Sequence, residues 1–192
     1  MKIFFVASQR GKEKYEKNYK AIFDTIEALG HRNLDDRMFK STVEGFYSKM
    51  KKDGQDAYQK LFNENVQFIK QADINIFECS WQSFSIGYMV QKSVELNKPT
   101  IVLYDETTAH TPYFILGANE EKLIVKTYTL DNLKNTLTDA IDRASTLADK
   151  RFNFFISPSQ LNYLNEQSRK QGITKSTFIR NLILEYRKKN QK

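Results

Sequence analysis

The sequence predicts an α/β fold, with a parallel sheet covered by helices on both faces, followed by a small basic module. Short apolar runs without polar alternation recur between amphipathic helical segments, which is typical of buried parallel strands. Residues 150–192 hold ten Lys or Arg and two Glu, a net charge of +8, whereas the other residues hold 20 basic and 21 acidic side chains. This division predicts two domains, residues 1–149 and 150–192, and a polyanion as the partner of the second.

The first domain alternates strands and helices along the chain. The apolar run at residues 2–7 predicts the first strand, and an amphipathic helix over 13–29 ends at Gly30. The further elements are a helix over 42–71 broken near Asp53-Gly54, a buried strand at 74–79, a helix at 84–96, strands at 100–104 and 122–126, and a helix at 131–149 that runs into the second domain. Parallel sheets of this Rossmann-like kind bind ligands beyond the carboxyl ends of their strands. The loops at 8–12, 80–83 and 105–117 are therefore the candidate sites.

The second domain shows a strand followed by two capped helices. Residues 151–156 predict a strand that places Phe152, Phe154 and Ile156 on one face. A capping box over 157–160 starts a helix that ends at Gly172. Thr174 then caps a helix from Lys175 to about Lys189, and its predicted buried side consists of Phe178, Ile179, Leu182, Ile183 and Tyr186.

Composition restricts the functional classes. The single Cys79, predicted in a buried strand, excludes an internal disulfide and favours a reducing setting. The sequence has no N-terminal signal pattern and no apolar run of transmembrane length. We therefore expect a cytoplasmic protein without a membrane partner. The two histidines are too few and too far apart to suggest a metal site, and no cofactor is expected.

Two motifs resemble one enzyme family. The run F-F-V-A-S-Q-R-G at residues 4–11 resembles the opening "Y-F-x-G-S-I-R-G" of the nucleoside 2-deoxyribosyltransferase superfamily. The run Q-A-D-I-N-I-F-E-C-S-W-Q-S-F-S-I-G-Y-M-V at 71–90 resembles "Q-A-D-V-V-V-A-E-V-T-x-P-S-L-G-V-G-Y-E-L" of the same family. The resemblance covers about residues 2–148 and is nearest to the 2'-deoxynucleoside 5'-monophosphate N-glycosidases. It implies the same Rossmann-like fold.

The resemblance also implies a mechanism with two carboxyl groups. In the family a Glu attacks the anomeric carbon of the sugar, an Asp protonates the leaving base, and a Tyr orients the Glu. At the corresponding positions this sequence has Met89, Asn65 and Phe4. A thioether cannot replace a carboxylate nucleophile, and an amide cannot act as a general acid. We therefore expect no catalytic residue at these degenerate positions.

The phosphate site of the family is partly kept. The resemblance assigns nucleotide binding to Ser8, Gln9, Arg10, Gly11, Ser83 and Gly87. Backbone N–H groups and a guanidinium at the turn after the first strand suit an anion. The later family loop "S-A-M-I-R-G" corresponds to P-Y-F-I-L-G at 112–117, which lacks the Ser and the Arg. We expect a deoxynucleotide or another phosphate as ligand. Glu78, at the end of the second buried strand, is the candidate for a relocated acid.

Residues 150–189 resemble the ribbon-helix-helix family in the order and spacing of their elements. The run I-T-K-S-T-F-I-R-N-L-I at 173–183 is similar to the start of that family's second helix. The resemblance implies that two chains pair their strands and insert the outer side chains, here Arg151, Asn153 and Phe155, into the major groove of double-stranded DNA. It further implies phosphate contacts by Thr174, Lys175 and Ser176. Phe155 departs from the family, where this position is usually polar.

Three hypotheses follow. In the first, a non-catalytic nucleotide-binding body senses a ligand and the second domain binds DNA. In the second, the body is an active N-glycosidase or deoxyribosyltransferase that uses relocated acids. In the third, the chain is a partner-binding protein whose body is an oligomerisation scaffold, and the second domain is a basic dimerisation element without a DNA role. A homodimer or a homotetramer is expected, since one pairing surface in each domain gives either assembly.

Overall fold

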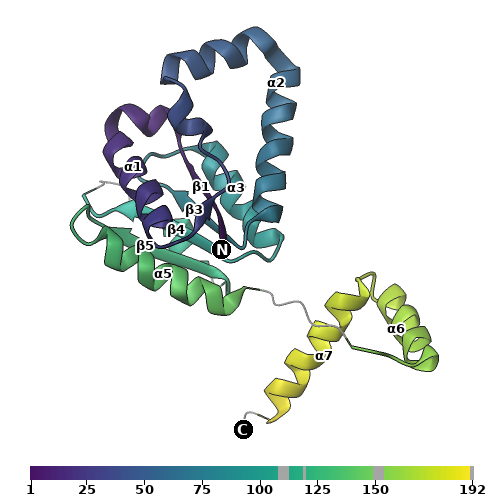
Figure 1. The fold of residues 1–192 in the computed structure, drawn as a ribbon. Coiled ribbons are helices and arrows are strands. Elements are labelled where there is room, and N and C mark those ends of the chain that lie inside the picture. Colours follow the sequence, from purple (N-terminus) through teal and green to yellow (C-terminus); the bar gives the residue numbers. More distant parts are fainter. Residues whose placement is uncertain (108–112, 119, 149–153, 191–192) are drawn as a thin grey trace. The chain divides into compact units, whose positions relative to one another are not determined.

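A computed structural model of the chain describes residues 1–107, 113–118, 120–148 and 154–190, and the chain divides into two compact units. We call Met1–Asp149 the body and Lys150–Lys192 the tail. In the described residues of the body, a central sheet is flanked by helices (Figure 1). Its elements are β1 (Lys2–Ala7), 3-10 helix η1 (Gln9–Gly11), α1 (Lys12–Ala28), β2 (Arg32–Asn33), 3-10 helix η2 (Arg37–Lys40), α2 (Val43–Gln71), β3 (Ile74–Glu78), α3 (Phe84–Glu95), β4 (Thr100–Asp105), α4 (Tyr113–Leu116), β5 (Leu123–Tyr128) and α5 (Leu133–Leu147).

The sheet has five strands in the order β2-β1-β3-β4-β5, and every pair is parallel. The predicted fold class, a Rossmann-like parallel sheet with helices on both faces, is confirmed. The chain leaves β1 toward one edge to form β2 and returns on the other side as β3. This reversal creates a crevice beyond the carboxyl ends of β1 and β3, where open α/β sheets bind ligands.

Two apolar cores cover the two faces of the sheet. On one face, side chains of the strands pack against α1 and α5, with Ile3, Ile76 and Leu103 fully buried. On the other face, Phe4, Phe77 and Val102 pack against α2 and α3. Neighbouring strand residues therefore point to opposite helix layers, as the period of two in a strand requires.

Most predicted elements of the body are present, with small shifts at their ends. The predicted break in α2 occurs at Gly54, whose φ of +62° is left-handed and suits glycine. The helix predicted to run to residue 149 ends at Leu147. Cys79 follows β3 rather than lying in it, and it is only partly buried. The two-residue β2, the 3-10 helices and α4 were not predicted because such short elements carry no periodic signal.

The tail contains two helices, α6 (Pro158–Lys170) and α7 (Lys175–Asn190). Ser157 and Gln160 form the predicted capping box, with Pro158 at the first helical position. Gly172 ends the turn with a φ of +65°. Thr174 Oγ1 accepts a hydrogen bond from Thr177 N at 3.1 Å, so the predicted cap of the second helix is confirmed.

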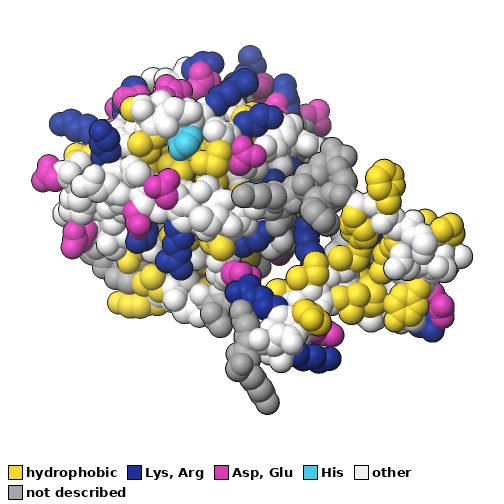
Figure 2. All heavy atoms as spheres, turned by 60° about the horizontal axis from the view of Figure 1, so that its bottom comes forward, with side chains coloured by type: hydrophobic (Ala, Val, Ile, Leu, Met, Phe, Trp, Pro, Cys, Tyr) yellow, Lys and Arg dark blue, Asp and Glu magenta, His cyan; other side chains and the backbone are white. Residues whose placement is uncertain are grey.

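The structure of the single chain differs from two of the predictions for the tail. Residues 154–156 form no strand, because a strand needs a hydrogen-bonding neighbour; residues 151–153 lie outside the described part. Of the predicted buried side of α7, Phe178 is buried, whereas Leu182, Ile183 and Tyr186 are exposed. Hydrophobic side chains consequently gather on the surface of the tail (Figure 2).

Within the described residues, no helix has the length and apolar character needed to cross a membrane.

Candidate functional site

An apolar groove of about 260 Å³ lies between α2 and α3. Its lining includes Asn65 and Met89, two of the three positions at which the sequence departs from the glycosidase motifs. Phe4, the third position, is fully buried beneath this layer and packs on Phe68, with ring centroids 5.2 Å apart. The structure thus brings these positions to one face of the sheet. The other lining residues are Tyr58, Leu61, Phe62, Val66, Ile69, Phe84, Ser85, Tyr88 and Lys92.

The groove offers aromatic surface and no acid. None of the described residues that line it is Asp, Glu, His or Cys. Phe62 and Tyr88 face each other with ring centroids 6.2 Å apart, and Phe84 is almost fully exposed at the rim. Lys92 supplies a cation that is paired with Glu95 at 3.2 Å. This lining suits a planar, uncharged ring, and none of its described side chains carries a carboxyl group that could protonate a leaving base as the family's Asp does.

Asn65 belongs to a polar cluster that the sequence did not reveal. Its Oδ1 accepts a hydrogen bond from Arg37 Nη2 at 3.1 Å. Arg37 is itself held by Asp35, with Nε–Oδ1 and Nη2–Oδ2 distances of 2.8 Å, and by Glu64. The hydrogen bond to Asp35, followed by the nearby negative charges, raises the pKa of Arg37. The carboxylates of Asp35 and Glu64 are therefore both paired with the cation that binds Asn65, and spacing along the chain gave no signal of this contact.

The turn after β1 carries Ser8, Gln9, Arg10 and Gly11, the predicted anion-binding residues. Ser8 and Gly11 are buried, and the exposed Arg10 lies over the Tyr47 ring at 5.5 Å. Gly11 has no room for a side chain, because a Cβ there would lie 2.3 Å from Tyr19 Oη and 2.5 Å from Trp81 Cβ. The backbone of the turn is thus tightly packed, while the guanidinium of Arg10 remains exposed.

The loop after β3 lies next to this turn, because β1 and β3 are neighbours in the sheet. Ser83 caps α3, its Oγ accepting from Ile86 N at 3.5 Å. Gly87 is exposed on α3 with open space around its Cα, so packing does not require glycine there. Ser8, Arg10 and Ser83 are consequently carried by adjacent loops at the crevice of the sheet.

Glu78 lies on the opposite face of the sheet from the groove. It is fully buried, and its Oε1 accepts hydrogen bonds from Ser80 and from Tyr128 Oη at 3.1 Å. Burial raises the pKa of the Glu78 carboxyl to about 7, although the hydrogen bonds from Ser80 and Tyr128 oppose the shift. The structure therefore does not bring this candidate acid together with Phe4, Asn65 and Met89.

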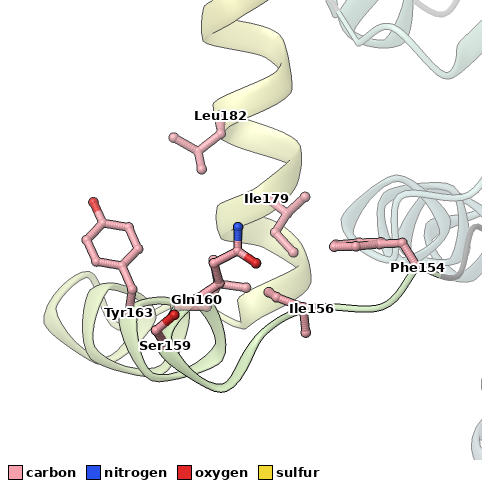
Figure 3. A pocket seen from close by; sticks show the side chains of 8 residues that line it. Phe154, Ile156, Ser159, Gln160, Tyr163, Ile179 and Leu182 are labelled. Atoms are coloured by element: carbon pink, nitrogen blue, oxygen red, sulfur yellow. The ribbon is translucent and has the colours of Figure 1, made fainter.

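In the tail, an apolar groove of about 430 Å³ is bounded by α6, α7 and the segment before α6 (Figure 3). It is lined by Phe154, Ile156, Ser159, Gln160, Tyr163, Leu164, Ile179 and Leu182. Phe155, between two lining residues, is fully exposed. Thr174, Lys175 and Ser176 stand at the start of α7, whereas Arg151 and Asn153 lie outside the described residues.

The parallel sheet and the helices on both of its faces define the body as a Rossmann-like α/β domain. No protein-family model matches the chain. The chain is 28% identical over 109 residues, 54% of its length and 68% of the relative's, to a Syntrophotalea carbinolica protein named "Putative 2'-deoxynucleoside 5'-phosphate N-hydrolase 1".

Two solved structures are similar to this chain. A 2-deoxyribosyltransferase from Bacillus psychrosaccharolyticus has a TM-score of 0.52 and 16% identity, covering 80% of this chain and all of that one. The CMP N-glycosidase BcmB of Clostridium botulinum has a TM-score of 0.49 and 16% identity, covering 74% of this chain and 98% of that one. The body therefore has the fold of the nucleoside 2-deoxyribosyltransferase-like proteins and is similar in sequence to a member of that group.

Proposed function

We propose that this chain is a DNA-binding protein in which two copies pair through their tails and the body binds a deoxynucleotide without hydrolysing it. The observation that carries the proposal is the open groove of the tail. Ile156, Ile179 and Leu182 form its apolar lining, and a surface of this kind is stable in water when another surface covers it. A second copy offers the same residues, so a two-fold pairing covers both grooves at once.

The paired tail would present a strongly basic surface to DNA. Its net charge of +8 attracts phosphates, and the start of α7 offers backbone N–H groups and Lys175. Phe155 points away from the groove, because it alternates with Phe154 and Ile156, which line it. In the strand that the sequence predicts for the paired tails, Arg151 and Asn153 would share the side of Phe155, the side that would face the bases.

The body is proposed to bind rather than react. At the positions of the family's nucleophile and general acid the groove has Met89 and Asn65, and none of its described lining residues carries a carboxyl group to replace them. Glu78 is sealed under the other face of the sheet, so it supplies neither role. Ser8, Arg10 and Ser83 can hold a phosphate, and the aromatic groove can hold a base.

The similarity to an N-hydrolase favours a second candidate, an active nucleotide N-glycosidase. The two functions differ in one assay. The full chain is incubated with dAMP, dCMP, dGMP and dTMP in turn, and free base is measured by chromatography while the melting temperature is measured in parallel. Our proposal predicts a rise in melting temperature with at least one nucleotide and no base above background. Base release that is lost in Glu78→Gln would establish the second candidate instead.

A pair of variants tests the anion site. Arg10→Ala should lose most of the nucleotide-induced rise in melting temperature, because it removes the accessible cation of the β1 turn. Arg143→Ala, which removes an exposed arginine of α5, is the matched control and should keep the rise. Equal behaviour of the two variants would refute phosphate binding at the β1 turn.

A further inference from the structure

Beneath the candidate anion site, a closed ring of hydrogen bonds is buried between α1 and the ends of three strands. Asn18 Nδ2 donates to Asp105 Oδ2 at 2.7 Å and to Tyr128 Oη at 3.1 Å. Tyr128 Oη and Ser80 Oγ both donate to Glu78 Oε1. Ser80 Oγ in turn accepts from Asp105 N at 2.7 Å. The ring fixes one oxygen of the Glu78 carboxyl.

The other oxygen of that carboxyl is not satisfied in the same way. Among the described residues, Glu78 Oε2 and Tyr19 Oη are buried without a hydrogen bond of regular geometry. The two groups are neighbours, since burial and then the Glu78 charge raise the pKa of Tyr19. A proton on Oε2 would give this pair a donor and an acceptor. An ionised Glu78 leaves a buried charge with one bare oxygen, which is costly in a protein interior.

Among the described residues, no cation interacts with the Glu78 carboxyl to offset its charge. The titratable groups that interact with it in the described residues are Tyr19 of α1, Cys79 after β3, Asp105 of β4 and Tyr128 of β5. Asp105 is the charged member of this set, and like charge favours the protonated form of Glu78.

The carboxyl contacts both loops of the candidate anion site through single side chains. Tyr19 Oη reaches the β1 turn, where a Cβ on Gly11 would lie 2.3 Å from it. Ser80 begins the loop that contains Trp81 and ends at Ser83, and its backbone N and Oγ both bond Glu78 Oε1. A change in the charge of Glu78 therefore acts on both loops directly.

We propose that Glu78 is a proton-binding site that couples the charge of a ligand on the Ser8–Gly11 turn to the packing of the Ser80–Ser83 loop. The coupling rests on the nucleotide binding proposed for the body. An anion at Ser8 and Arg10 disfavours a second negative charge beneath them, so its binding is accompanied by proton uptake at Glu78. The affinity for the anion consequently falls as the pH rises and Glu78 ionises, because linkage is reciprocal.

Trp81, the one tryptophan in the sequence, lies in the Ser80–Ser83 loop and is a natural reporter of its packing. Its fluorescence in the full chain without ligand is followed from pH 5.5 to 8.5. We expect one transition near pH 7, its absence in Glu78→Gln, and its retention in Glu95→Gln, an acid of α3 that is paired with Lys92. A transition that persists in Glu78→Gln, or none in the unaltered chain, would overturn the proposal.

A second variant covers the case in which Glu78→Gln fails to fold. Tyr128→Phe removes a hydrogen bond that favours the ionised carboxylate, so the midpoint should move to higher pH. An unchanged midpoint would count against Glu78 as the titrating group.

The coupling is tested by repeating the titration with each of the four deoxynucleoside monophosphates. A ligand that raises the melting temperature should also move the Trp81 midpoint upward, and its affinity should fall several-fold more between pH 6 and 8 in the unaltered chain than in Glu78→Gln. This comparison removes the titration of the phosphate itself. A ligand that binds without moving the midpoint overturns the coupling. If no nucleotide raises the melting temperature, the proposed nucleotide binding and the coupling both fail, while the ligand-free titration still decides the proton site.

Discussion

The body and the tail bury their apolar residues to very different extents. In the body, two cores close around the sheet, and residues such as Ile76, Val102 and Leu137 have no exposed surface. In the tail, two capped helices enclose an open groove. Among the described residues of the tail, the buried hydrophobic side chains are those of Leu164 and Phe178. Both parts carry capping residues and amphipathic helices, so the difference in burial comes from tertiary packing.

Because of this difference in burial, the body and the tail are expected to be stabilised in different ways. A sheet covered on both faces can fold as a single chain, whereas a 43-residue segment with two helices rarely buries enough surface alone. Our proposal therefore makes the stability of the tail depend on a second chain, and that of the body independent of one. The net positive charge is likewise concentrated in the tail, the part whose pairing would, in our proposal, create a DNA-binding surface.

The largest expected effect comes from a charge placed in the tail groove. Leu182→Glu buries a carboxylate where the second copy should pack, at a cost of at least about 2 kcal/mol, and should abolish pairing through the tail. Leu184→Glu is the matched control, because Leu184 is 47% exposed against 45% for Leu182 but does not line the groove. Light scattering of the full chain and DNA binding report the result. Similar losses of pairing and DNA binding in both variants would show that the two tails do not contact each other through the groove.

The next effect concerns the body alone and its response to pH. Glu78 has a pKa of about 7 in the folded chain against 4.5 in an unstructured one, so the native state binds the proton more tightly. Its stabilising effect is full below about pH 4.5 and is lost as the pH rises through 7, a change of about 3 kcal/mol.

Urea unfolding of the full chain at pH 5 and pH 8 measures this change. Glu78→Gln should remove most of the difference in unfolding free energy between the two pH values. A variant with the same pH dependence as the unaltered chain would contradict the assignment of a raised pKa to Glu78.

A moderate effect is expected on base recognition by the tail. Arg151→Ala and Asn153→Ala should each reduce discrimination between DNA sequences by roughly 1–3 kcal/mol, because each would lose a contact to a base edge. Competition between a selected duplex and random duplexes measures the discrimination. If both variants keep the full preference, the side chains that read the bases lie elsewhere.

The smallest effect is expected at the start of α7. Lys175→Ala should weaken binding to all duplexes alike and reduce the slope of log affinity against log salt by about one unit, because one phosphate contact is lost. A titration at several salt concentrations gives the slope. A selective loss for one sequence would instead make Lys175 a base-reading residue.

The sequence predicted the features that depend on neighbouring residues. The strands around Ile76 and Val102, the break at Gly54 and the caps at Ser157 and Thr174 all carry local signals, and the structure has them. The two-residue β2 escaped prediction because its strand geometry comes from pairing with β1.

The features that depend on distant residues were not predicted. Glu78 is at the end of a strand near the crevice, but only the sheet and its helix layers show that it faces α1 and α5 rather than the groove. Likewise, the contact between Arg37 and Asn65 joins residues 28 positions apart. Leu182 and Tyr186, which the sequence predicted to be buried, are exposed in the single chain, and our proposal assigns their burial to a second chain.

The division of labour between the two parts is tested most directly by removing the tail. Residues 1–149 and the full chain are compared for binding to the same fluorescent duplex over a range of salt concentrations, with circular dichroism as a check on folding. We predict that residues 1–149 unfold cooperatively yet bind no DNA, while the full chain binds with an affinity that falls steeply with salt. A folded body that binds the duplex as tightly as the full chain, with the same salt slope, would contradict the account and leave the tail as a dimerisation element only.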